Sequence, residues 1–155
     1  MSYTYKYPRP SFTADCLVFA GNRENAHLLL IQRKNWPFEG MWALPGGFMD
    51  MDETIEETAA RELEEETGLS GLRLFQFRVY SAIDRDPRGR TVTLAFYGYA
   101  GGQIPRVKGN TDAVNAVWHT IGGLPPLGFD HGKIIEDFIR SPLFEKIFNM
   151  KKRES

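Results

Sequence analysis

The sequence predicts an α/β or α+β fold, in which helices pack on a mixed β-sheet. Two observations support this fold class. Short apolar segments with strand character occupy most of the chain, while one long amphipathic segment interrupts them and another helical segment follows the last of them. This order of elements is typical of a sheet covered by helices. At 155 residues the chain has the length of one domain, and we expect residues 1–155 to form a single unit.

The first third of the chain is expected to form an arm followed by three strands. Residues 1–11 contain alternating tyrosines and two prolines, a pattern typical of an extended arm or an edge strand. The apolar runs TADCLVFA and HLLLIQ, residues 13–20 and 27–32, follow as strands, joined by a polar turn over residues 21–25. A short strand over residues 42–44 ends at the sequence Pro-Gly-Gly.

A helix is expected to begin near Thr54 and to end before Gly68. Thr54 and Glu57 have the spacing of a capping box, in which each side chain accepts a hydrogen bond from the other's backbone N–H. Gly68 stands where the left-handed residue of a C-terminal cap belongs. The helix carries an apolar stripe for the core: Ile55, Ala59 and Leu63.

Three further strands and two helices are expected in the second half of the chain. The strands are residues 72–81, 91–100 and 113–119, and the turn sequence Asp-Pro-Arg-Gly joins the first two. Residues 132–139 are expected to form a helix, and a short helix follows Pro142. The second half therefore supplies more strands to the sheet and a second layer of helices.

Composition and charge exclude several classes of protein. The net charge of −1 offers no basic field, so we expect no nucleic-acid partner. No apolar run approaches the roughly 20 residues of a membrane span, and the N-terminus lacks the apolar core of a signal peptide. The single cysteine, Cys16, excludes an internal disulfide and is typical of a reducing compartment. We therefore expect a cytoplasmic protein with no membrane partner.

The most informative segment is the long helix, because its glutamates crowd on one face. Between residues 53 and 66 there are seven glutamates and one basic residue, Arg61. Glu62, Glu65 and Glu66 stand at i, i+3 and i+4, so they share a face and repel one another by about 0.2–0.5 kcal/mol per pair. A hard cation such as Mg²⁺ or Mn²⁺, bound by carboxylate oxygens, would remove that repulsion.

Two other interpretations of this segment are open from the residues alone. The helix could be an exposed one whose charges are solvated, although such helices usually intersperse lysines. Residues 50–54, DMDET, also match the DxDxT signature of phosphoryl-aspartate phosphatases. That signature follows a buried strand, whereas the sequence Gly-Gly-Phe-Met precedes it here.

Residues 47–69 resemble the Nudix box of Nudix hydrolases. Their sequence, GFMDMDETIEETAARELEEETGL, fills every fixed position of the pattern G-x5-E-x7-R-E-x-x-E-E-x-G. The resemblance implies a Nudix-type α/β/α sandwich with a mixed β-sheet over the whole chain. It also implies an enzyme that hydrolyses a nucleoside diphosphate linked to a group X, with Mg²⁺ or Mn²⁺ as its cofactor.

The resemblance assigns roles to residues of the box and of one loop. Three glutamates and a backbone carbonyl are the implied metal ligands: Glu62, Glu65, Glu66 and Gly47. Arg61 would orient the glutamates by salt bridges, and by spacing alone Arg61 and Glu65 are neighbours at i and i+4. Glu53 would support the site. The attacking water needs a general base, either a box glutamate, Glu62 or Glu65, or Asp112 on a downstream loop.

Outside the box, residues 33–38, 84–89 and 129–131 are similar to stretches of ADP-ribose pyrophosphatases. The candidate substrate-binding side chains are Arg33, Trp36, Phe38, Arg85, Arg88 and Arg90. The arginines could bind phosphates or lie on a solvated hairpin tip, and the aromatic residues could stack on adenine or serve packing. Two positions depart from the pattern, because Ile83 stands where many of these enzymes carry proline and Arg90 where some carry histidine.

We therefore expect hydrolysis of ADP-ribose to AMP and ribose 5-phosphate. The alternative within the class is a nucleoside triphosphate pyrophosphatase of the 8-oxo-dGTP kind. The alternative from another class is a module that senses ADP-ribose without cutting it, as in regulators that carry a DNA-binding domain after the Nudix fold. We expect this chain to end soon after its last helix, which favours an enzyme. By analogy with ADP-ribose pyrophosphatases, a homodimer joined by the tyrosine-rich arm is a further expectation, and we expect His119 and His131 to be structural.

Overall fold

The structure, a computed structural model, describes residues 2–108 and 115–150, and its seven strands form one sheet. The elements in chain order are β1 (Ser11–Ala20), η1 (Arg23–Asn25), β2 (His27–Gln32), β3 (Trp42–Ala43), β4 (Gly46–Phe48), α1 (Ile55–Thr67), β5 (Phe75–Tyr80), β6 (Thr91–Tyr99), β7 (Asn115–Thr120), η2 (Ile121–Gly123), α2 (His131–Arg140) and α3 (Pro142–Ile147). The sheet is mixed as predicted, because β1 and β6 are parallel and the other paired strands are antiparallel.

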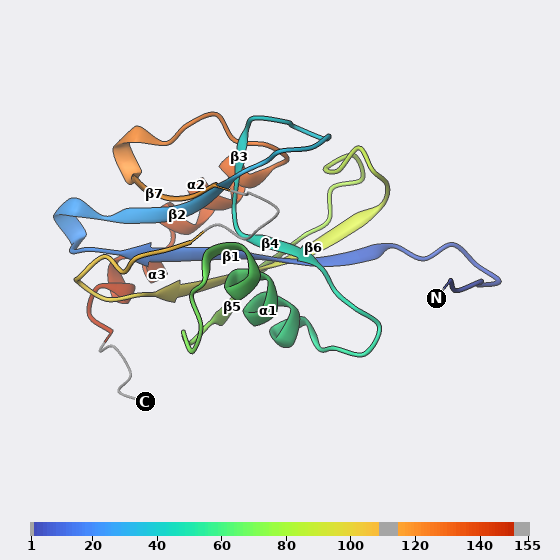
Figure 1. Ribbon diagram of the computed structural model, residues 1–155, viewed down its shortest axis with the longest axis horizontal. Coiled ribbons are helices and arrows are strands. Elements are labelled where there is room, and N and C mark those ends of the chain that lie inside the picture. Colours follow the sequence, from blue (N-terminus) through green and yellow to red (C-terminus); the bar gives the residue numbers. More distant parts are fainter. Residues whose placement is uncertain (1, 109–114, 151–155) are drawn as a thin grey trace.

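The sheet is the middle layer of three (Figure 1). Helix α1 covers one face, and α2 and α3 cover the other. Successive residues of β1 point to opposite faces, so Cys16 and Val18 pack toward α1 whereas Leu17 and Phe19 pack toward α2 and α3. Strand β1 is buried on both faces, which explains why its sequence is an almost continuous apolar run. The expected α/β/α sandwich is confirmed.

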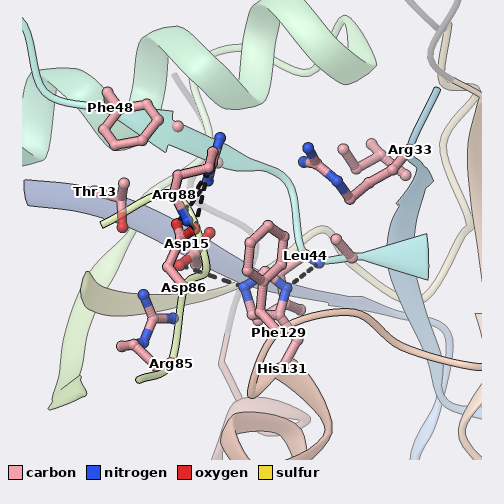
Figure 2. Close-up of a pocket in the computed structure, with 14 residues that line it drawn as sticks. Thr13, Asp15, Arg33, Leu44, Phe48, Arg85, Asp86, Arg88, Phe129 and His131 are labelled. Atoms are coloured by element: carbon pink, nitrogen blue, oxygen red, sulfur yellow. Dashed lines mark hydrogen bonds and ion pairs between the residues drawn. The ribbon is translucent and has the colours of Figure 1, made fainter. Parts of the chain in front are cut away.

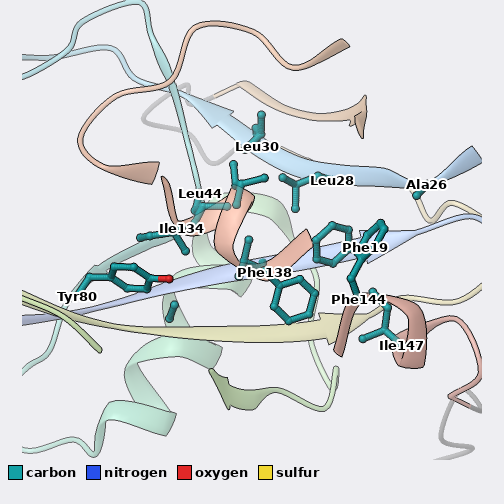
Figure 3. Packing of buried hydrophobic residues seen from close by; sticks show 13 residues of the cluster. Phe19, Ala26, Leu28, Leu30, Leu44, Tyr80, Ile134, Phe138, Phe144 and Ile147 are labelled. Carbon is teal, nitrogen blue, oxygen red and sulfur yellow. The ribbon is translucent and has the colours of Figure 1, made fainter. Parts of the chain in front are cut away.

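The larger of the two apolar clusters fixes α2 and α3 on the sheet (Figure 3). The ring of Phe19 stacks on Phe138 of α2 at 5.3 Å between centroids and meets Phe144 of α3 edge-on at 5.5 Å. Burial of each such side chain contributes roughly 1.5–3 kcal/mol. Helix α2 is therefore held firmly against the sheet, and this packing fixes the position of its first turn.

Strands β1 and β2 diverge along the sheet, and β3 and β4 fill the fork between them. Strand β1 pairs with β2 over residues 19–20, whereas nearer its start it pairs with β4 over residues 13–15. Strand β3 pairs with β2 over residues 31–32. The two short strands thus satisfy backbone groups that the fork would leave open. Their connection forms a corner, residues 44–47, close to the middle of the sheet.

Helix α1 begins and ends where local chemistry predicts. The side chain of Thr54 accepts a hydrogen bond from the Glu57 N–H at 3.1 Å, and the side chain of Glu57 accepts one from the Thr54 N–H at 2.9 Å. Gly68 ends the helix in the left-handed region, at φ 80°. Because Thr54 serves as the cap, the DxDxT interpretation of residues 50–54 is not supported. The predicted stripe packs against the sheet: Ile55, Ala59 and Leu63.

Three features of the secondary structure differ from the sequence prediction. Strand β1 begins at Ser11, within the expected arm, because the start of β6 supplies it with a parallel partner. Strand β5 begins only at Phe75, since Leu72 and Leu74 pack into the core from a loop. Strand β4 is absent from the prediction because its glycines carry no strand signal.

Residues 2–10 form an arm that projects from the body (Figure 1). Among the described helices, none has the length and apolar character needed to cross a membrane.

Candidate active site

Two consecutive glycines bring the backbone of the corner against the acidic face of α1. The Gly46 N–H donates a hydrogen bond to Glu66 Oε1 at 2.7 Å. A Cβ atom on Gly47 would lie 2.5 Å from the carboxyl carbon of Glu62, and one on Gly46 would collide with the backbone oxygen of Ala14. Only glycine allows so close an approach at both positions.

Arg61 is the centre of an ion-pair cluster on the acidic face. Its guanidinium group donates to both carboxylate oxygens of Glu53, at 2.7 and 3.0 Å, and to Glu62 at 2.8 Å. The Arg61–Glu65 contact that the spacing predicts is present at 3.3 Å. The guanidinium also reaches the carbonyl oxygen of Phe48 at 3.0 Å. Hydrogen bonding from Arg61 lowers the pKa of Glu53 to about 2, so this pair is the strongest anchor of the cluster.

Among the three glutamates predicted as metal ligands, Glu62 and Glu66 are partly buried. Burial raises the pKa of Glu66 to about 8, and the negative charges of Glu62 and Asp15 act in the same direction. Burial also raises the pKa of Glu62, although Arg61 opposes the shift. Glu65, by contrast, is half exposed. A positive ion beside Glu62 and Glu66 would favour the charged form of both.

The chemistry of this donor set fits a hard divalent cation. The candidate ligands all offer oxygen, and two of the carboxylates, Glu62 and Glu66, are partly buried and repel each other. Within residues 2–108 and 115–150, no three acidic, histidine or cysteine side chains converge closely enough to hold an ion by themselves. Mg²⁺ keeps several waters and takes one or two carboxylates together with substrate phosphates, so it does not need a closed cage. The assignment of the ligands stays a prediction: Gly47, Glu62, Glu65 and Glu66.

A pocket opens beside the corner, between β1, the β5–β6 loop and the segment before α2 (Figure 2). Gly46 and Gly47 line it, so the pocket and the acidic face of α1 meet at the corner. The polar and aromatic side chains that dominate its wall are Asp15, Arg33, Arg85, Asp86, Arg88 and Phe129. Three of the predicted substrate-binding arginines therefore come together in one place.

Arg33 and Arg88 present their guanidinium groups to the same aromatic ring. Their guanidinium carbons lie 5.0 and 5.3 Å from the centroid of Phe129. Arg88 also stacks on Phe48 at 4.7 Å and pairs with Asp86 at 2.8 Å. Burial lowers the pKa of Arg33, and the like charge of Arg88 lowers it further. An anion bound in this pocket would favour the charged form of Arg33.

Arg85 also lies in an ion pair, but its side chain is far less exposed than that of Arg88, which pairs with Asp86 and stays 33% exposed. The Arg85 side chain is only 3% exposed, and it donates two hydrogen bonds to Asp130, at 2.6 and 2.9 Å. This bidentate geometry is the strongest arrangement open to an arginine and a carboxylate. The geometry therefore favours a role for Arg85 in supporting the pocket wall rather than the expected direct contact with substrate.

His131 and Asp15 form a buried polar network beneath the pocket. His131 Nδ1 accepts a hydrogen bond from the Leu44 N–H at 3.0 Å, and its Nε2 lies 3.6 Å from Asp15 Oδ2. Asp15 also accepts a hydrogen bond from the Thr93 hydroxyl at 2.6 Å. The sequence predicts a structural His131 and assigns no role to Asp15. A carboxylate within the apolar run TADCLVFA is the signal that could have revealed it, since aspartates are rarely buried without a partner.

The remaining candidate residues lie away from the pocket centre. Trp36 is 69% exposed and lies outside the pocket lining. Phe38 meets Phe129 edge-on at 4.8 Å, as the packing interpretation predicts. Arg90 is exposed and donates to a backbone carbonyl of its own loop at 3.3 Å. Asp112, the loop candidate for the general base, lies outside the described residues.

Comparison with known proteins agrees with this fold and this site. The family model described as the NUDIX domain matches residues 9–138. The ADP-ribose pyrophosphatase of Methanocaldococcus jannaschii is 42% identical over 135 residues, which are 86% of this chain and 76% of that protein. The NUDIX domain of Shewanella oneidensis NrtR, complexed with ADP ribose, has a TM-score of 0.76 and 31% identity over 86% of this chain and 90% of that chain. The bifunctional NMN adenylyltransferase/ADP ribose pyrophosphatase of Francisella tularensis, complexed with AMP and Mn ion, has a TM-score of 0.75 and 30% identity over 87% of this chain and 42% of that one.

An α/β/α sandwich with a complete box on α1 defines the Nudix fold. The chain belongs to the Nudix family, and it is a Nudix hydrolase. The box does not specify the substrate.

Proposed function

We propose that this Nudix hydrolase splits ADP-ribose into AMP and ribose 5-phosphate with the help of a divalent cation. One observation carries the proposal: opposite charges meet at the glycine corner, with Glu62 and Glu66 on one side and Arg33 and Arg88 on the other. A diphosphate with its cation carries both signs of charge and complements both sides. Similarity to the ADP-ribose pyrophosphatase of M. jannaschii supports this choice of substrate.

The acidic side would hold Mg²⁺ or Mn²⁺ through the Gly47 carbonyl and the box glutamates. Such an ion neutralises phosphoanhydride oxygens and makes an attacking water more acidic. Arg61 supports this side directly, because its contacts with Glu62 and Glu65 restrict the orientation of both carboxylates. Similarity to the F. tularensis protein, whose structure contains AMP and Mn ion, supports the choice of a divalent cation as cofactor.

The reaction adds one water across the phosphoanhydride. The water oxygen forms a bond to one phosphorus, the bridging oxygen leaves with the other phosphate, and a base accepts a proton from the water. We propose a box glutamate, Glu62 or Glu65, or Asp112 as that base. Arg33 and Arg88 would bind the phosphate oxygens and hold the diphosphate against the corner, which lowers the entropic part of the barrier.

A second candidate is a module that binds ADP-ribose without cutting it. Similarity to the NUDIX domain of S. oneidensis NrtR, whose structure contains ADP ribose, favours this candidate. The arginines of the pocket would serve binding in either case. Binding alone, however, gives no reason for a full set of box glutamates oriented by Arg61, so we place hydrolysis first. A nucleoside triphosphate pyrophosphatase is the third candidate and differs in its substrate.

A panel of substrates separates the three candidates. The purified chain is incubated with Mg²⁺ and either ADP-ribose or 8-oxo-dGTP, and the products are identified by liquid chromatography. We expect AMP and ribose 5-phosphate from ADP-ribose at a rate well above that of the triphosphate. Turnover of the triphosphate alone would refute the proposed substrate. Calorimetric binding of ADP-ribose with no product under Mg²⁺ or Mn²⁺ would indicate a sensor.

A further inference from the structure

We propose that His131 is a positioning residue, which holds the glycine corner against the acidic face of α1 and so sets the cation site from the opposite side of the sheet. The inference rests on the proposed role of Gly47 and the box glutamates as cation ligands. It extends that proposal to a side chain outside the box, on the first turn of α2.

The corner depends on His131 for a backbone hydrogen bond. Between β3 and β4 the chain leaves both strand ladders, and the Leu44 N–H donates to His131 Nδ1 at 3.0 Å. Leu44 is 2% exposed and His131 is 3% exposed, so water cannot replace this acceptor without a rearrangement. A buried N–H without an acceptor is strongly unfavourable, and the chain at Leu44 would move to find one.

His131 also acts on the corner indirectly, because it lies next to Asp15, which packs against Gly46. Because Nδ1 accepts a hydrogen bond, the ring proton lies on Nε2, which faces Asp15 Oδ2 at 3.6 Å. The other oxygen of Asp15 packs against Gly46, where a Cβ atom would lie 2.5 Å from it. The Thr93 hydroxyl holds the carboxylate in place at 2.6 Å. His131 and Asp15 thus together form the surface against which the corner packs.

Two further hydrogen bonds hold the corner from other directions. The Cys16 N–H of β1 donates to the Pro45 carbonyl at 2.8 Å, and the Gly46 N–H donates to Glu66 at 2.7 Å. His131 connects the corner to α2, and the aromatic residues of the core hold α2 firmly against the sheet (Figure 3). Residues that orient the ligands of a metal ion typically change its affinity by about 10- to 100-fold when they are replaced. Loss of the acceptor at position 131 would shift Leu44, and with it the Gly46–Glu66 contact and the carbonyl of Gly47.

Matched substitutions at position 131 test this role in the whole chain without substrate. His131→Leu removes the acceptor, His131→Asn keeps an oxygen close to the Nδ1 position, and His131→Gln carries its amide farther out. The first measurement is exchange of the Leu44 amide proton with deuterium, followed by NMR in the absence of metal. The second is binding of Mn²⁺, followed by the electron paramagnetic resonance of the free ion. Ile147→Ala controls for general loss of stability, because Ile147 is buried in α3 on a different helix.

We expect His131→Leu to accelerate Leu44 exchange and to weaken Mn²⁺ binding, each by about tenfold or more, while His131→Asn stays close to the unmodified chain. Equal Mn²⁺ affinity of His131→Leu and the unmodified chain would overturn the proposal. An equal loss of affinity in Ile147→Ala would do the same.

The test can still decide the proposal if His131→Leu does not fold. If His131→Leu is unfolded, the proposal requires His131→Asn to bind Mn²⁺ more tightly than His131→Gln, and equal affinities overturn it. No step of this test involves turnover. Failure of the unmodified chain to hydrolyse ADP-ribose would therefore refute the proposed substrate while the role of His131 stands or falls on Leu44 exchange and Mn²⁺ binding.

Discussion

The two sides of the glycine corner carry opposite charges and are built in different ways. On the α1 side, Arg61 contacts Glu62 and Glu65 of the same helix and Glu53 just before it. On the pocket side, Arg33 and Arg88 come from separate loops and share the ring of Phe129. An acidic side suits a cation and an arginine side suits a phosphate. Under the proposed function, each side is half of one site, which a diphosphate and its cation would complete together.

The largest expected effect concerns stability, and it tests whether Arg85 of the pocket side has a structural role. Replacement of Arg85 by Met leaves Asp130 without its buried partner, so we expect the free energy of unfolding to fall by about 3–5 kcal/mol. Urea unfolding measures the change. Arg140→Met is the matched control, since it removes an exposed ion pair with Glu136 and should change the free energy by less than about 1 kcal/mol. Unchanged stability of Arg85→Met would contradict the structural role and favour direct contact of Arg85 with substrate.

The second prediction concerns the acidic side. We expect Glu65→Gln to lower the turnover of ADP-ribose by about 100-fold or more, because it removes a carboxylate that helps to stabilise the transition state. The fold should be intact, since Glu65 is half exposed. Initial rates of AMP formation at saturating Mg²⁺ measure the effect. Glu64→Gln, one residue earlier on the exposed face, should keep nearly full activity. A normal rate in Glu65→Gln would contradict the cation assignment.

The acidic side could be predicted from the sequence because its geometry is local. The i, i+4 spacing on one helix predicts the Arg61–Glu65 contact, whereas the Arg61–Glu53 contact joins the helix to the segment before it. The capping chemistry of Thr54 and Gly68 determines where that helix begins and ends. The strands of the sheet followed from apolar runs in the same way. A regular element translates sequence distance directly into spatial distance, so these predictions needed no knowledge of the tertiary structure.

Three arginines of the pocket side were named from the sequence, but most of their contacts could not be predicted, because they join residues far apart in the chain. Arg85 and Asp130 are separated by 45 positions, and no local pattern distinguishes a paired arginine from one that awaits a phosphate. Strand β4 exists because β1 offers it a free edge, and its glycines have no strand preference of their own. The role of His131 likewise depends on Leu44, a distant residue whose buried N–H needs an acceptor.

The third prediction tests the arginine side of the corner. We expect Arg33→Ala to raise the KM for ADP-ribose by about 10- to 100-fold, since a hydrogen bond to a charged group contributes about 1.5–3 kcal/mol. The turnover number should change less than KM. Steady-state kinetics measure both values. Arg90→Ala is the control, because Arg90 is exposed outside the pocket lining, and its KM should stay close to that of the unmodified chain. An unchanged KM of Arg33→Ala would remove Arg33 from the site.

The fourth prediction is a pH dependence of stability on the acidic side. The folded-state pKa of Glu66, about 8, lies above its ordinary value of 4.5, so its stabilising contribution is complete below pH 4.5 and is lost as the pH rises towards 8. Glu66→Gln removes that loss. In EDTA we expect the gain in stability of Glu66→Gln over the unmodified chain to be larger at pH 8 than at pH 5. Urea unfolding at pH 5 and pH 8 measures the difference, and the same gain at both values would contradict the assignment.

The most direct test of the two-sided site uses an ADP-ribose analogue with a methylene group in place of the bridging oxygen, which cannot be hydrolysed at the anhydride. Calorimetry measures its affinity with and without Mg²⁺. If the diphosphate and the cation bridge the glycine corner together, each must tighten the binding of the other by the same factor. We expect this mutual gain in the unmodified chain and its loss in Glu65→Gln, whereas Arg33→Ala should weaken binding with or without Mg²⁺. An affinity of the unmodified chain that does not depend on Mg²⁺ would contradict a shared site.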